Sequence, residues 1–594
     1  MKEQWLMTNR YISDEDKTIF EQLHISRPLA RVIANRDVSG QDITNYVNGT
    51  ANDLSSPWLL KNMDQAVDII GIKIALKSKI RIIGDYDVDG ICSTYILYKA
   101  LSQMGADVDY AIPHRVEDGY GINEKLIEDA HKAEVDTIIT CDNGISASRE
   151  IDYAKSLGMT VIITDHHEVP FEESDGGKKY ILPKADTVIN PKQPDCTYPF
   201  KEICGAYVAL QLVRALVETN ELDMKDYNNL FLYAAVATVC DVMDLIKENR
   251  TLVKYGLKLF ATIEDLGIVA LTDVLGLSRD SISSYNIGFM IGPCLNATGR
   301  LDTARKAVEL FTAKSEEQAK AIAQELVDLN KTRQELTEQN VNEALKIAEN
   351  MEEKVLVVFL PDCHESIAGI VAGRIREKYN KPTIVLTKSE EGVKGSGRSI
   401  EAYNMYEELT KVSDLLTKFG GHTMAAGLSL EESNVDVLRN RLNEQTTLTD
   451  EDMILKVYMD DELQINEITE SFTNSLDLIQ PFGKANPKPS FANRNLSIKK
   501  LQIIGKDKSS VRLTLTDSNG AVSITGLIFK KASELLQLIR EVYGSEELER
   551  VLEGRHNSVM IDIVFYPSIN EYNNNKYIQI IIDRFRIGGR YASN

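Results

Sequence analysis

The sequence predicts an α/β protein in four parts: a domain with a parallel sheet, a long connecting helix, a second α/β domain and a small C-terminal β-barrel. Three observations lead to this prediction. Short β-branched runs alternate with helical patterns over about residues 79–245, a polar stretch rich in Glu, Gln and Lys covers 313–351, and strand patterns fill the chain after 455. Strands that alternate with helices build a mostly parallel sheet with helices on both faces.

The size and composition of the chain indicate several globular domains. Its 594 residues exceed the size at which one hydrophobic core stops growing. It has 43% hydrophobic and 26% charged residues, and it lacks an apolar run of about 18 residues, the length that a membrane helix needs. The start, MKEQWLMTNRYISDED, lacks the basic and then apolar order of a signal peptide. We therefore expect a cytoplasmic protein without a membrane span.

Net charge and cysteine spacing argue against two further classes. The net charge of −22 opposes a surface coated for nucleic-acid binding, so a polyanionic partner would need a local basic channel. The seven cysteines are scattered and form no CxxC pair, which disfavours a disulfide framework or a zinc ribbon.

The order of elements gives the domain boundaries that we expect. The strands KIRIIG, DVDYAI, DTIITC, MTVIIT and TVIN alternate with helices, and helical patterns follow from 205 to 243. After the long helix, EKVLVVFL, PTIVLT, the Gly-rich GVKGSGRS and FGGHTMAAGLSL form the second α/β region. We place a helical extension at 1–50, the parallel-sheet domain at 51–310, the connecting helix at 311–352, the second domain at 353–450 and the barrel at 451–594. Five or so strands with one helix near 531–542 are typical of an oligonucleotide-binding (OB) barrel.

An acidic motif lies at the mouth of the first strand of the predicted sheet. GDYDVDG places Asp85, Asp87 and Asp89 at alternate positions. One aspartate would suffice to cap the following helix, whereas three unpaired carboxylates raise one another's pKa and destabilise the fold. Three alternating carboxylates therefore predict a bound divalent cation.

Three more motifs supply metal-ligand residue types. Asp142 ends the strand DTIITC, and Asp165, His166 and His167 end the strand TVIIT. Asp241 lies in the apolar helical run AAVATVCDVMDL, where burial of an unpaired carboxylate would be costly. Ligands bind beyond the carboxyl ends of parallel strands. Together the motifs predict a site for two Mn²⁺ or Mg²⁺ ions, which at roughly 3.5–4 Å apart would activate water for phosphoester cleavage.

In this order, DYDVDG, CDNG, TDHHE and VCDVMDL resemble motifs one to four of the DHH phosphoesterase superfamily. The later GPCLNATGRL, HESIAGIVAGRI, GSGRS and FGGHTMAAG resemble its accessory DHHA1 domain. With the barrel, the resemblance covers about residues 55–590. In this order of domains the chain resembles superfamily exonucleases that degrade single-stranded DNA from 5′ to 3′.

The resemblance implies the metal ligands: Asp85 and Asp87 on one ion, Asp89, His166 and Asp241 on the other, and Asp142 as the bridge. Many smaller superfamily members carry a histidine where this chain has Ile83, so Asp85 is the compensating ligand that we expect. His167 would orient a ligand or touch the phosphate, and His422 would face the metals and bind the scissile phosphate.

The resemblance and the donor chemistry together predict the phosphate-binding residues. Glycine-rich strands let backbone N–H groups approach an anion, and arginine binds phosphate bidentately. The candidates are Arg115, Asn296, Arg300, Ser396, Arg398, Ser399 and His422. His364, which precedes a helix, is more typical of a cap or core residue.

The expected function is a two-metal 5′ to 3′ exonuclease on single-stranded DNA that releases 5′-mononucleotides in DNA repair and recombination. Single-strand-binding protein and a RecQ-type helicase are the partners that the family implies, and we expect a monomer. An oligoribonuclease, a cyclic-dinucleotide phosphodiesterase or a pyrophosphatase of the same superfamily remains open. A catalytically inactive replication scaffold is a further alternative, although the acidic motifs are intact here.

Overall fold

The computed structural model describes residues 3–115, 118–174, 177–301, 303–389, 392–517, 519–572 and 575–588. Within these ranges, no helix combines the length and the apolar composition needed to cross a membrane. All seven cysteines are free thiols.

The first sheet is parallel, as predicted. Its order is β3-β2-β4-β5-β8, and every neighbouring pair runs in the same direction. Its strands are β2 (Lys79–Ile83), β3 (Asp107–Ala111), β4 (Thr137–Cys141), β5 (Thr160–Thr164) and β8 (Thr187–Ile189). The central strands β4 and β5 are almost entirely buried, which explains their near-continuous apolar sequence.

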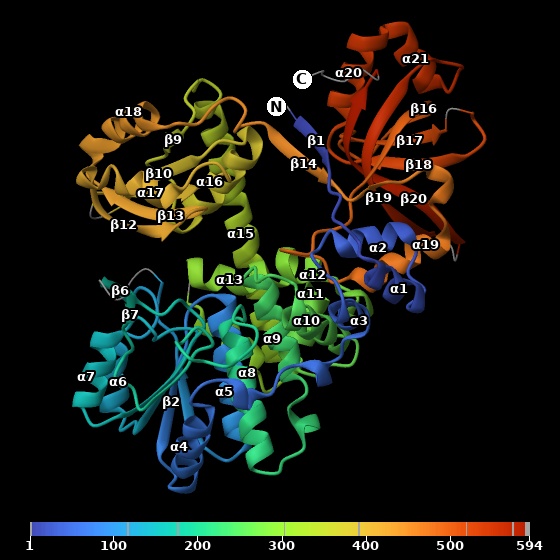
Figure 1. The fold of residues 1–594 in the computed structure, drawn as a ribbon. Helices are drawn as coiled ribbons and strands as arrows, with labels where there is room; N and C mark the ends of the chain where they lie inside the picture. Colours follow the sequence, from blue (N-terminus) through green and yellow to red (C-terminus); the bar gives the residue numbers. More distant parts are fainter. Residues whose placement is uncertain are drawn as a thin grey trace. The chain divides into compact units, whose positions relative to one another are not determined.

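Helices cover both faces of this sheet (Figure 1). On one face, α6 (Glu124–Lys132) and α7 (Ser148–Ser156) share an apolar core with the strands. On the other, α5 (Val88–Gln103) and α8 (Gly205–Thr219) contact β2, β4 and β5, and α9 (Leu230–Cys240) packs against both helices. A hairpin of β6 (Phe171–Ser174) and β7 (Gly177–Tyr180), which the sequence analysis did not anticipate, precedes β8.

A helical layer and the predicted long helix follow. The layer contains α10 (Lys247–Leu259), α11 (Leu266–Val274), α12 (Ser284–Asn286), the π-helix η5 (Ile287–Ile291), α13 (Gly292–Leu301) and α14 (Arg305–Phe311). The long helix is α15 (Glu316–Ala348), which spans 33 residues. It begins where the Ser315 side chain accepts a hydrogen bond from the Gln318 N–H.

The second α/β region has a sheet in the order β12-β13-β11-β10-β9. Its strands are β9 (Leu356–Phe359), β10 (Thr383–Ser389), β11 (Gly392–Arg398), β12 (Leu416–His422) and β13 (Ala425–Leu430). Only the β9–β10 pair among them is parallel. The helices α16 (Glu365–Tyr379), α17 (Met405–Thr410) and α18 (Val435–Gln445) complete this region.

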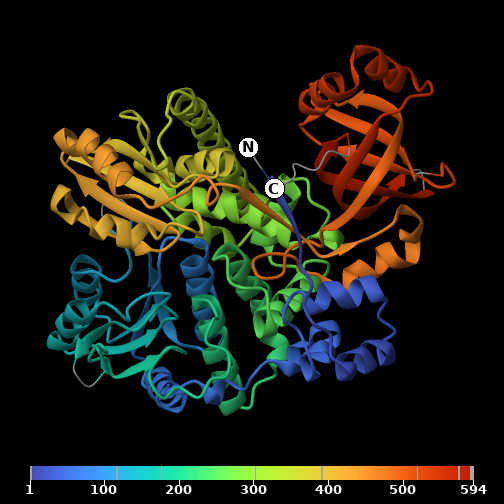
Figure 2. The ribbon, with the colours of Figure 1, turned by 45° about the horizontal axis from the view of Figure 1, so that its top comes forward.

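The C-terminal region is the predicted closed barrel (Figure 2, red). Its strands pair in the order β16-β17-β18-β20-β19, and β19 pairs back to β16. They are β16 (Phe491–Ile504), β17 (Ser510–Thr516), β18 (Ser523–Ile528), β19 (Met560–Tyr572) and β20 (Asn575–Ile587). The expectation of one helix was incomplete, because α21 (Ser545–Glu553) follows α20 (Ala532–Tyr543) after Gly544.

The chain divides into two compact units that are not contiguous in sequence. The first contains residues 55–243 and 255–455, and the second joins 5–54 and 244–254 to 456–594. In the second unit, α1 (Asp14–Gln22), α2 (Arg27–Ala34) and α3 (Gln41–Asn48) share one apolar core with the barrel. Arg36 Nη1 lies 2.6 Å from Asp460 Oδ1, a buried ion pair within that unit. The unit also contains β15 (Asp461–Glu462), α19 (Glu470–Ser475) and all of β14 (Leu455–Met459) after its first residue.

Candidate active site

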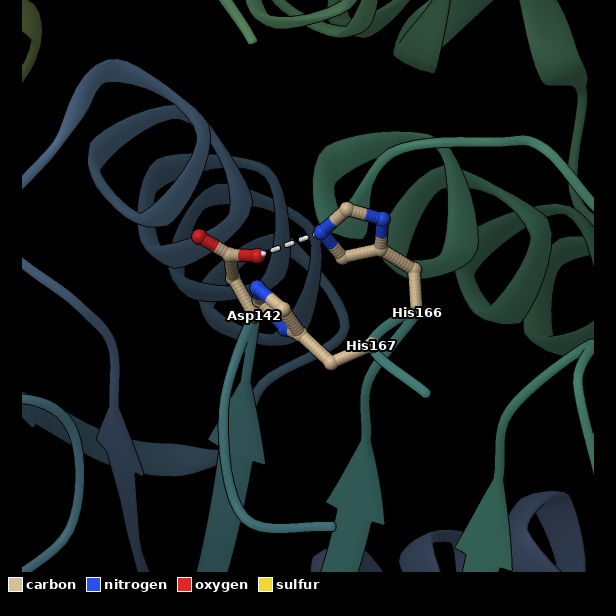
Figure 3. A group of neighbouring side chains, drawn as sticks. All are labelled: Asp142, His166 and His167. Atoms are coloured by element: carbon tan, nitrogen blue, oxygen red, sulfur yellow. Dashed lines mark ion pairs between the residues drawn. The ribbon is translucent and has the colours of Figure 1, made fainter. Parts of the chain in front are cut away.

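The acidic motifs meet at the carboxyl edge of the parallel sheet. Asp85 follows β2, Asp142 follows β4, and His166 and His167 follow β5. Figure 3 shows Asp142 and the two histidines beyond the ends of neighbouring strands, with the Asp142 carboxylate directed at the His166 ring. This placement is what the strand-end positions of the motifs predict for a parallel sheet.

Backbone N–H groups hold two carboxylates of the first motif in place: that of Asp87, just before α5, and that of Asp89, in its first turn. Asp87 caps this helix, and its Oδ1 accepts hydrogen bonds from the N–H groups of Asp89 and Gly90 at 2.9 and 3.1 Å. The two oxygens of Asp89 accept from the Gly205 and Ala206 N–H groups, both at 2.7 Å. These N–H groups open α8, so a helix N-terminus holds the Asp89 charge.

Asp142 occupies a sterically restricted position. Its φ is +61°, a left-handed conformation in which aspartate is one of the more tolerated residues. Gly205 packs directly against it, since a Cβ on Gly205 would lie 2.7 Å from the Asp142 Cβ and 2.8 Å from its Oδ1. A restricted backbone held by close packing is a recurrent feature of functional sites.

The ligand atoms of the candidate residues gather in overlapping sets. Oxygen and nitrogen atoms lie within 4.8 Å of one another in Asp85, Asp87 and Asp142, in Asp89, His166 and Asp241, and in Asp142, His166 and His167. His166 Nε2 lies 3.1 Å from an Asp142 oxygen, 3.6 Å from an Asp89 oxygen and 3.9 Å from an Asp241 oxygen. All six predicted ligands therefore contribute to one cluster.

Unsatisfied buried atoms test whether this cluster suits metal ions. Asp85 Oδ2 and His166 Nδ1 are buried without a hydrogen-bond partner among the described residues, and Asp142 Oδ1 makes no hydrogen bond there although His166 Nε2 lies 3.1 Å away. Such atoms are costly unless something else coordinates or bonds them. Carboxylate oxygens and imidazole nitrogen are ligands for Mg²⁺ and Mn²⁺, so the donor set fits these ions.

The electrostatics of the cluster point in the same direction. Burial, followed by the charge of Asp87, raises the pKa of Asp85 to about 7. Burial and the charges of neighbouring aspartates also raise the pKa of Asp87 and Asp142 above the ordinary range, for Asp142 by a large margin. Without a cation the charged carboxylates are therefore disfavoured.

The buried Asp165 carboxylate orients the two histidines that follow it in the chain. Its Oδ1 accepts hydrogen bonds from the His166 and His167 N–H groups at 2.7 and 3.1 Å and lies 2.8 Å from His167 Nδ1. Its Oδ2 accepts from the Ile145 N–H at 2.9 Å. Burial opposes the charged form of His167, but Asp165 outweighs it and raises the pKa of His167 to about 9. Both oxygens of Asp165 thus make hydrogen bonds within the protein, and a ring nitrogen of His167 lies within 4.8 Å of ligand atoms of Asp142 and His166.

Asp241 differs from the sequence-based expectation of a carboxylate buried inside an apolar helix. It is the C-cap of α9, and its side chain is 29% exposed. The helix supplies the apolar run and ends at this residue. Negative charge is unfavourable at a helix C-terminus, so a neighbouring cation would stabilise Asp241.

A cavity of about 460 Å³ lies in the same unit and joins the loop after β2 to the second sheet. Arg115 lines it, and its guanidinium carbon lies 4.8 Å from the centre of the Tyr86 ring, which lines it too. Its other polar lining residues include Ser366, Thr387, Lys394, Ser396, Lys418 and Ser429. Glu365 lines the cavity as well, and its carboxylate lies 2.9 Å from Lys394 Nζ. Arg115, Lys418 and the hydroxyl groups are the lining side chains that suit an anion.

The predicted phosphate-binding residues of the second sheet are Ser396, which also lines this cavity, Arg398, Ser399 and His422. Arg398 and Ser396 both approach Gly369 of α16, where a Cβ would lie 2.7 Å from Arg398 Nη2 and 3.2 Å from Ser396 Oγ. The sheet register pairs Ala425 with both Arg398 and the exposed His422. Ser399 is buried and its hydroxyl donates to the Tyr403 carbonyl oxygen at 2.5 Å, so this hydroxyl is committed to the fold.

Three further predictions have different outcomes. Asn296 is half-buried in α13, which approaches the first motif at Gly299, where a Cβ would lie 2.6 Å from the Tyr86 carbonyl oxygen. The side chain of Arg300 lies outside the described part of the structure. His364 caps α16, as expected, because its Nδ1 accepts from the Ser366 N–H.

Sequence reasoning missed several residues of the site. The Tyr120 hydroxyl donates to the Asp142 carbonyl oxygen at 2.6 Å and lies 3.3 Å from His167 Nδ1. Buried Asn143 donates to the Ile83 and Cys141 carbonyl oxygens and so ties β2 to β4. The sequence signal for them was that each lies inside a motif singled out for another residue: Tyr120 in PHRVEDGYG with Arg115, and Asn143 in CDNG with Asp142.

A parallel sheet whose carboxyl edge carries this cluster, beside a cationic cavity, defines the chain as a metal-dependent phosphoesterase. Its segments match three family descriptions: "DHH family, N-terminal domain" over 79–238, "DHHA1 domain" over 352–447 and "RecJ OB domain" over 459–584. The chain belongs to the RecJ family.

The relatives are similar over almost the whole chain. The single-stranded-DNA-specific exonuclease RecJ of Bacillus subtilis is 35% identical, over 96% of this chain and 69% of the relative. The RecJ of Escherichia coli K12 is 31% identical, over 98% and 99%. The crystal structure of RecJ in complex with Mn²⁺ from Thermus thermophilus matches with a TM-score of 0.80 and 25% identity, over 98% of this chain and 80% of that one.

Proposed function

We propose that the protein hydrolyses single-stranded DNA from the 5′ end and releases 5′-mononucleotides, in DNA repair and recombination. The observation that carries the proposal is the cluster of six ligand side chains with unsatisfied buried atoms, in a chain 31% identical to an exonuclease over 99% of that relative's length. The cationic cavity in the same unit gives the phosphate of a strand end a place to bind.

We assign Asp85 and Asp87 to one divalent cation, Asp89, His166 and Asp241 to a second, and Asp142 to both. Mn²⁺ or Mg²⁺ bound there would supply an activated water and neutralise the charge that develops on the scissile phosphate. The main-chain hydrogen bonds to Asp87 and Asp89 hold these carboxylates in place before binding. Such preorganisation lowers the cost of assembling the site.

The remaining residues bind and orient the substrate. Arg115, Ser396 and Arg398 would grip the 5′-terminal phosphate, and His422 would contact the phosphate that is cleaved. His167, held by Asp165, presents a ring nitrogen that can donate to a phosphate oxygen. We also infer that Asn296 and Arg300 position the strand beside the first acidic motif.

A small-substrate activity within the superfamily is the second candidate. Hydrolysis of oligoribonucleotides, cyclic dinucleotides or pyrophosphate would use the same ions and the same cavity. The closed barrel favours a longer strand, because such barrels bind single-stranded nucleic acid by stacking and backbone contacts. A catalytically inactive scaffold would not need to keep the complete ligand cluster.

We infer that single-stranded DNA is the main partner, and that a single-strand-binding protein and a RecQ-type helicase act with the enzyme. We further propose that it works as a monomer. Its bacterial relatives are named as exonucleases specific for single-stranded DNA, which supports a place of action in the cytoplasm.

One assay separates these functions. Single-stranded DNA labelled at the 5′ or the 3′ end, duplex DNA, RNA and a cyclic dinucleotide would be offered side by side with Mn²⁺. The proposal expects rapid release of mononucleotides from the 5′ end of single-stranded DNA, and little cleavage of the duplex. Faster hydrolysis of the cyclic dinucleotide or RNA, or digestion from the 3′ end, would contradict it.

A further inference from the structure

Two aromatic side chains of the first unit stack on each other in solvent. Tyr285 of α12 is 64% exposed and Phe289 of the π-helix η5 is 65% exposed. Their ring centres are 4.8 Å apart and their planes differ by 26°. Large exposed aromatic side chains usually mark an interaction site, because burying them is favourable.

The local sequence explains why the rings are displayed rather than packed. They occur in SYNIGFMIG, four residues apart, where the helix widens into a π-turn. Gly288 lies between them, and a Cβ there would be 3.6 Å from Val239 Cγ1 of α9, so the small residue is on the packed side. π-helical turns inside helices often occur at functional sites.

The aromatic pair lies on the same end of α9 as a candidate metal ligand. The Cys240 thiol at the end of α9 is 4.0 Å from the Ile287 carbonyl oxygen, and a Cβ on Gly292 would come within 2.4 Å of its sulfur. The next residue along the chain is Asp241, whose oxygen lies 3.9 Å from His166 Nε2. The π-helix therefore packs against the residue that directly precedes the metal cluster.

Val242 adds a second unusual feature at this place. It is 60% exposed and has a φ of +56°, which is rare and strained for a β-branched residue. Val242 directly follows Asp241 in the chain, and the π-helix that carries Phe289 packs against the same end of α9 through Ile287 and Gly288. An apolar surface beside a phosphate-cleaving centre suits the uncharged part of a nucleotide.

We propose that Tyr285 and Phe289 form a stacking platform for a nucleobase of the single-stranded substrate, close to the scissile phosphate. The inference rests on the proposed function and deepens it. Stacking on aromatic rings is tolerant of sequence because every base has a π-face. It also adds affinity without positive charge, which matters in a chain of net charge −22.

The test measures oligonucleotide binding by full-length protein carrying Asp142→Asn, so that DNA is not consumed. A series of otherwise identical strands contains one abasic nucleotide at successive positions. We expect one position at which the missing base lowers affinity by about tenfold, and Phe289→Ala or Tyr285→Ala to cost about the same on the intact strand. In either alanine variant, the abasic position should then cost little more.

The matched controls separate stacking from a structural role. Tyr285→Phe keeps the ring and should bind like the parent. Trp58→Ala removes a 39% exposed aromatic residue that hydrogen-bonds to Glu218, about 20 Å along α8 from the metal cluster, and should leave the abasic pattern unchanged. Thermal unfolding of each variant checks its fold, and if one alanine variant is unstable, the other alanine variant and the abasic series on the parent supply the test.

Two results would overturn the platform. Either the parent shows no position-dependent loss across the abasic series, or the alanine variants lose the same factor on the abasic strand as on the intact one. Degradation of single-stranded DNA by the unmodified enzyme is measured in parallel. Degradation together with a flat abasic series would reject the platform alone, whereas lack of both degradation and binding would reject the proposed function.

Discussion

The carboxyl edge of the parallel sheet and the glycine-rich strands of the second sheet suit ligands of opposite charge. At the first, several aspartates lie close together beside His166, and buried oxygen and nitrogen atoms among them make no hydrogen bond. At the second, β11, β12 and β13 carry small residues with Arg398, Lys394 and Lys418 nearby. In the proposed sites, side chains would bind the cations, whereas close backbone approach and basic groups would bind the anion.

This difference shows that net charge says little about the ligand. The chain carries −22 overall, yet bound ions would partly neutralise the acidic cluster, and the cavity lined by Arg115 and Lys418 is the place that we propose for the phosphate. The sign of the local field, set by a few residues, decides what binds.

Removal of the shared carboxylate should give the largest effect. Asp142→Asn should lower release of mononucleotides from end-labelled single-stranded DNA with Mn²⁺ by about a thousandfold or more. Because burial and like charges raise the pKa of Asp142, the native state disfavours its ionised form. The metal-free variant at pH 8 should therefore unfold at a higher temperature than the parent. Unchanged activity would refute the two-ion assignment.

Loss of the basic group at the anion site should have a smaller effect that depends on the substrate. Arg398→Ala should reduce use of 5′-phosphorylated strands by about 10- to 100-fold, since a charged hydrogen bond contributes about 1.5–3 kcal/mol. Strands with a 5′-hydroxyl should be affected less. Arg374→Ala, an exposed arginine on α16 paired with Glu377, is the matched control. An equal loss on both strand types would reject the phosphate role.

A methyl group added behind the acidic cluster should perturb it indirectly. Gly205→Ala places a Cβ 2.7 Å from the Asp142 Cβ and should cost about 1–3 kcal/mol of stability, with about tenfold weaker Mn²⁺ binding. Gly373→Ala, where the space is open, should be neutral or slightly stabilising. Calorimetric titration with Mn²⁺ and thermal unfolding measure both effects. Equal behaviour of the two variants would show that packing against Asp142 is unimportant.

The smallest expected effect is on pH dependence. The pKa of Asp85 is about 7 in the folded protein without metal and near 3.8 when unfolded. Its protonated form is therefore favoured by folding, so this group's contribution to stability falls as pH rises from about 4 to 7. Mn²⁺ must displace that proton, so affinity should drop severalfold from pH 7.5 to 6.5. Proton release, measured by calorimetry in two buffers, should be smaller in Asp85→Asn.

Much of the site was predictable because its residues follow strand ends. Asp142 directly follows an apolar strand and Asp85 and His166 follow theirs by one further residue, and a parallel sheet brings such positions to one edge. Asp241 was predictable as part of the motif series, but its helix-end position was not. An apolar helix that ends at a residue has the same composition as one that continues past it.

Other features depend on contacts that sequence spacing does not encode. The hydrogen bonds from Gly205 and Ala206 to Asp89 cross more than a hundred residues. The sequence made Ser399 a plausible donor to an anion, but its hydroxyl donates to the Tyr403 carbonyl oxygen instead. The hairpin β6–β7 was missed because FEES and GKKY do not alternate apolar and polar residues.

The buried pair of Arg36 with Asp460 has a consequence for biosynthesis. These residues are 424 positions apart, and residues 5–54 share their core with the barrel. At roughly 5–20 residues per second, a ribosome would add the intervening chain in roughly 20–85 s. During that time the apolar faces of α1 to α3 are not covered by the barrel. The nascent N-terminal segment is therefore where a holding chaperone would be needed first.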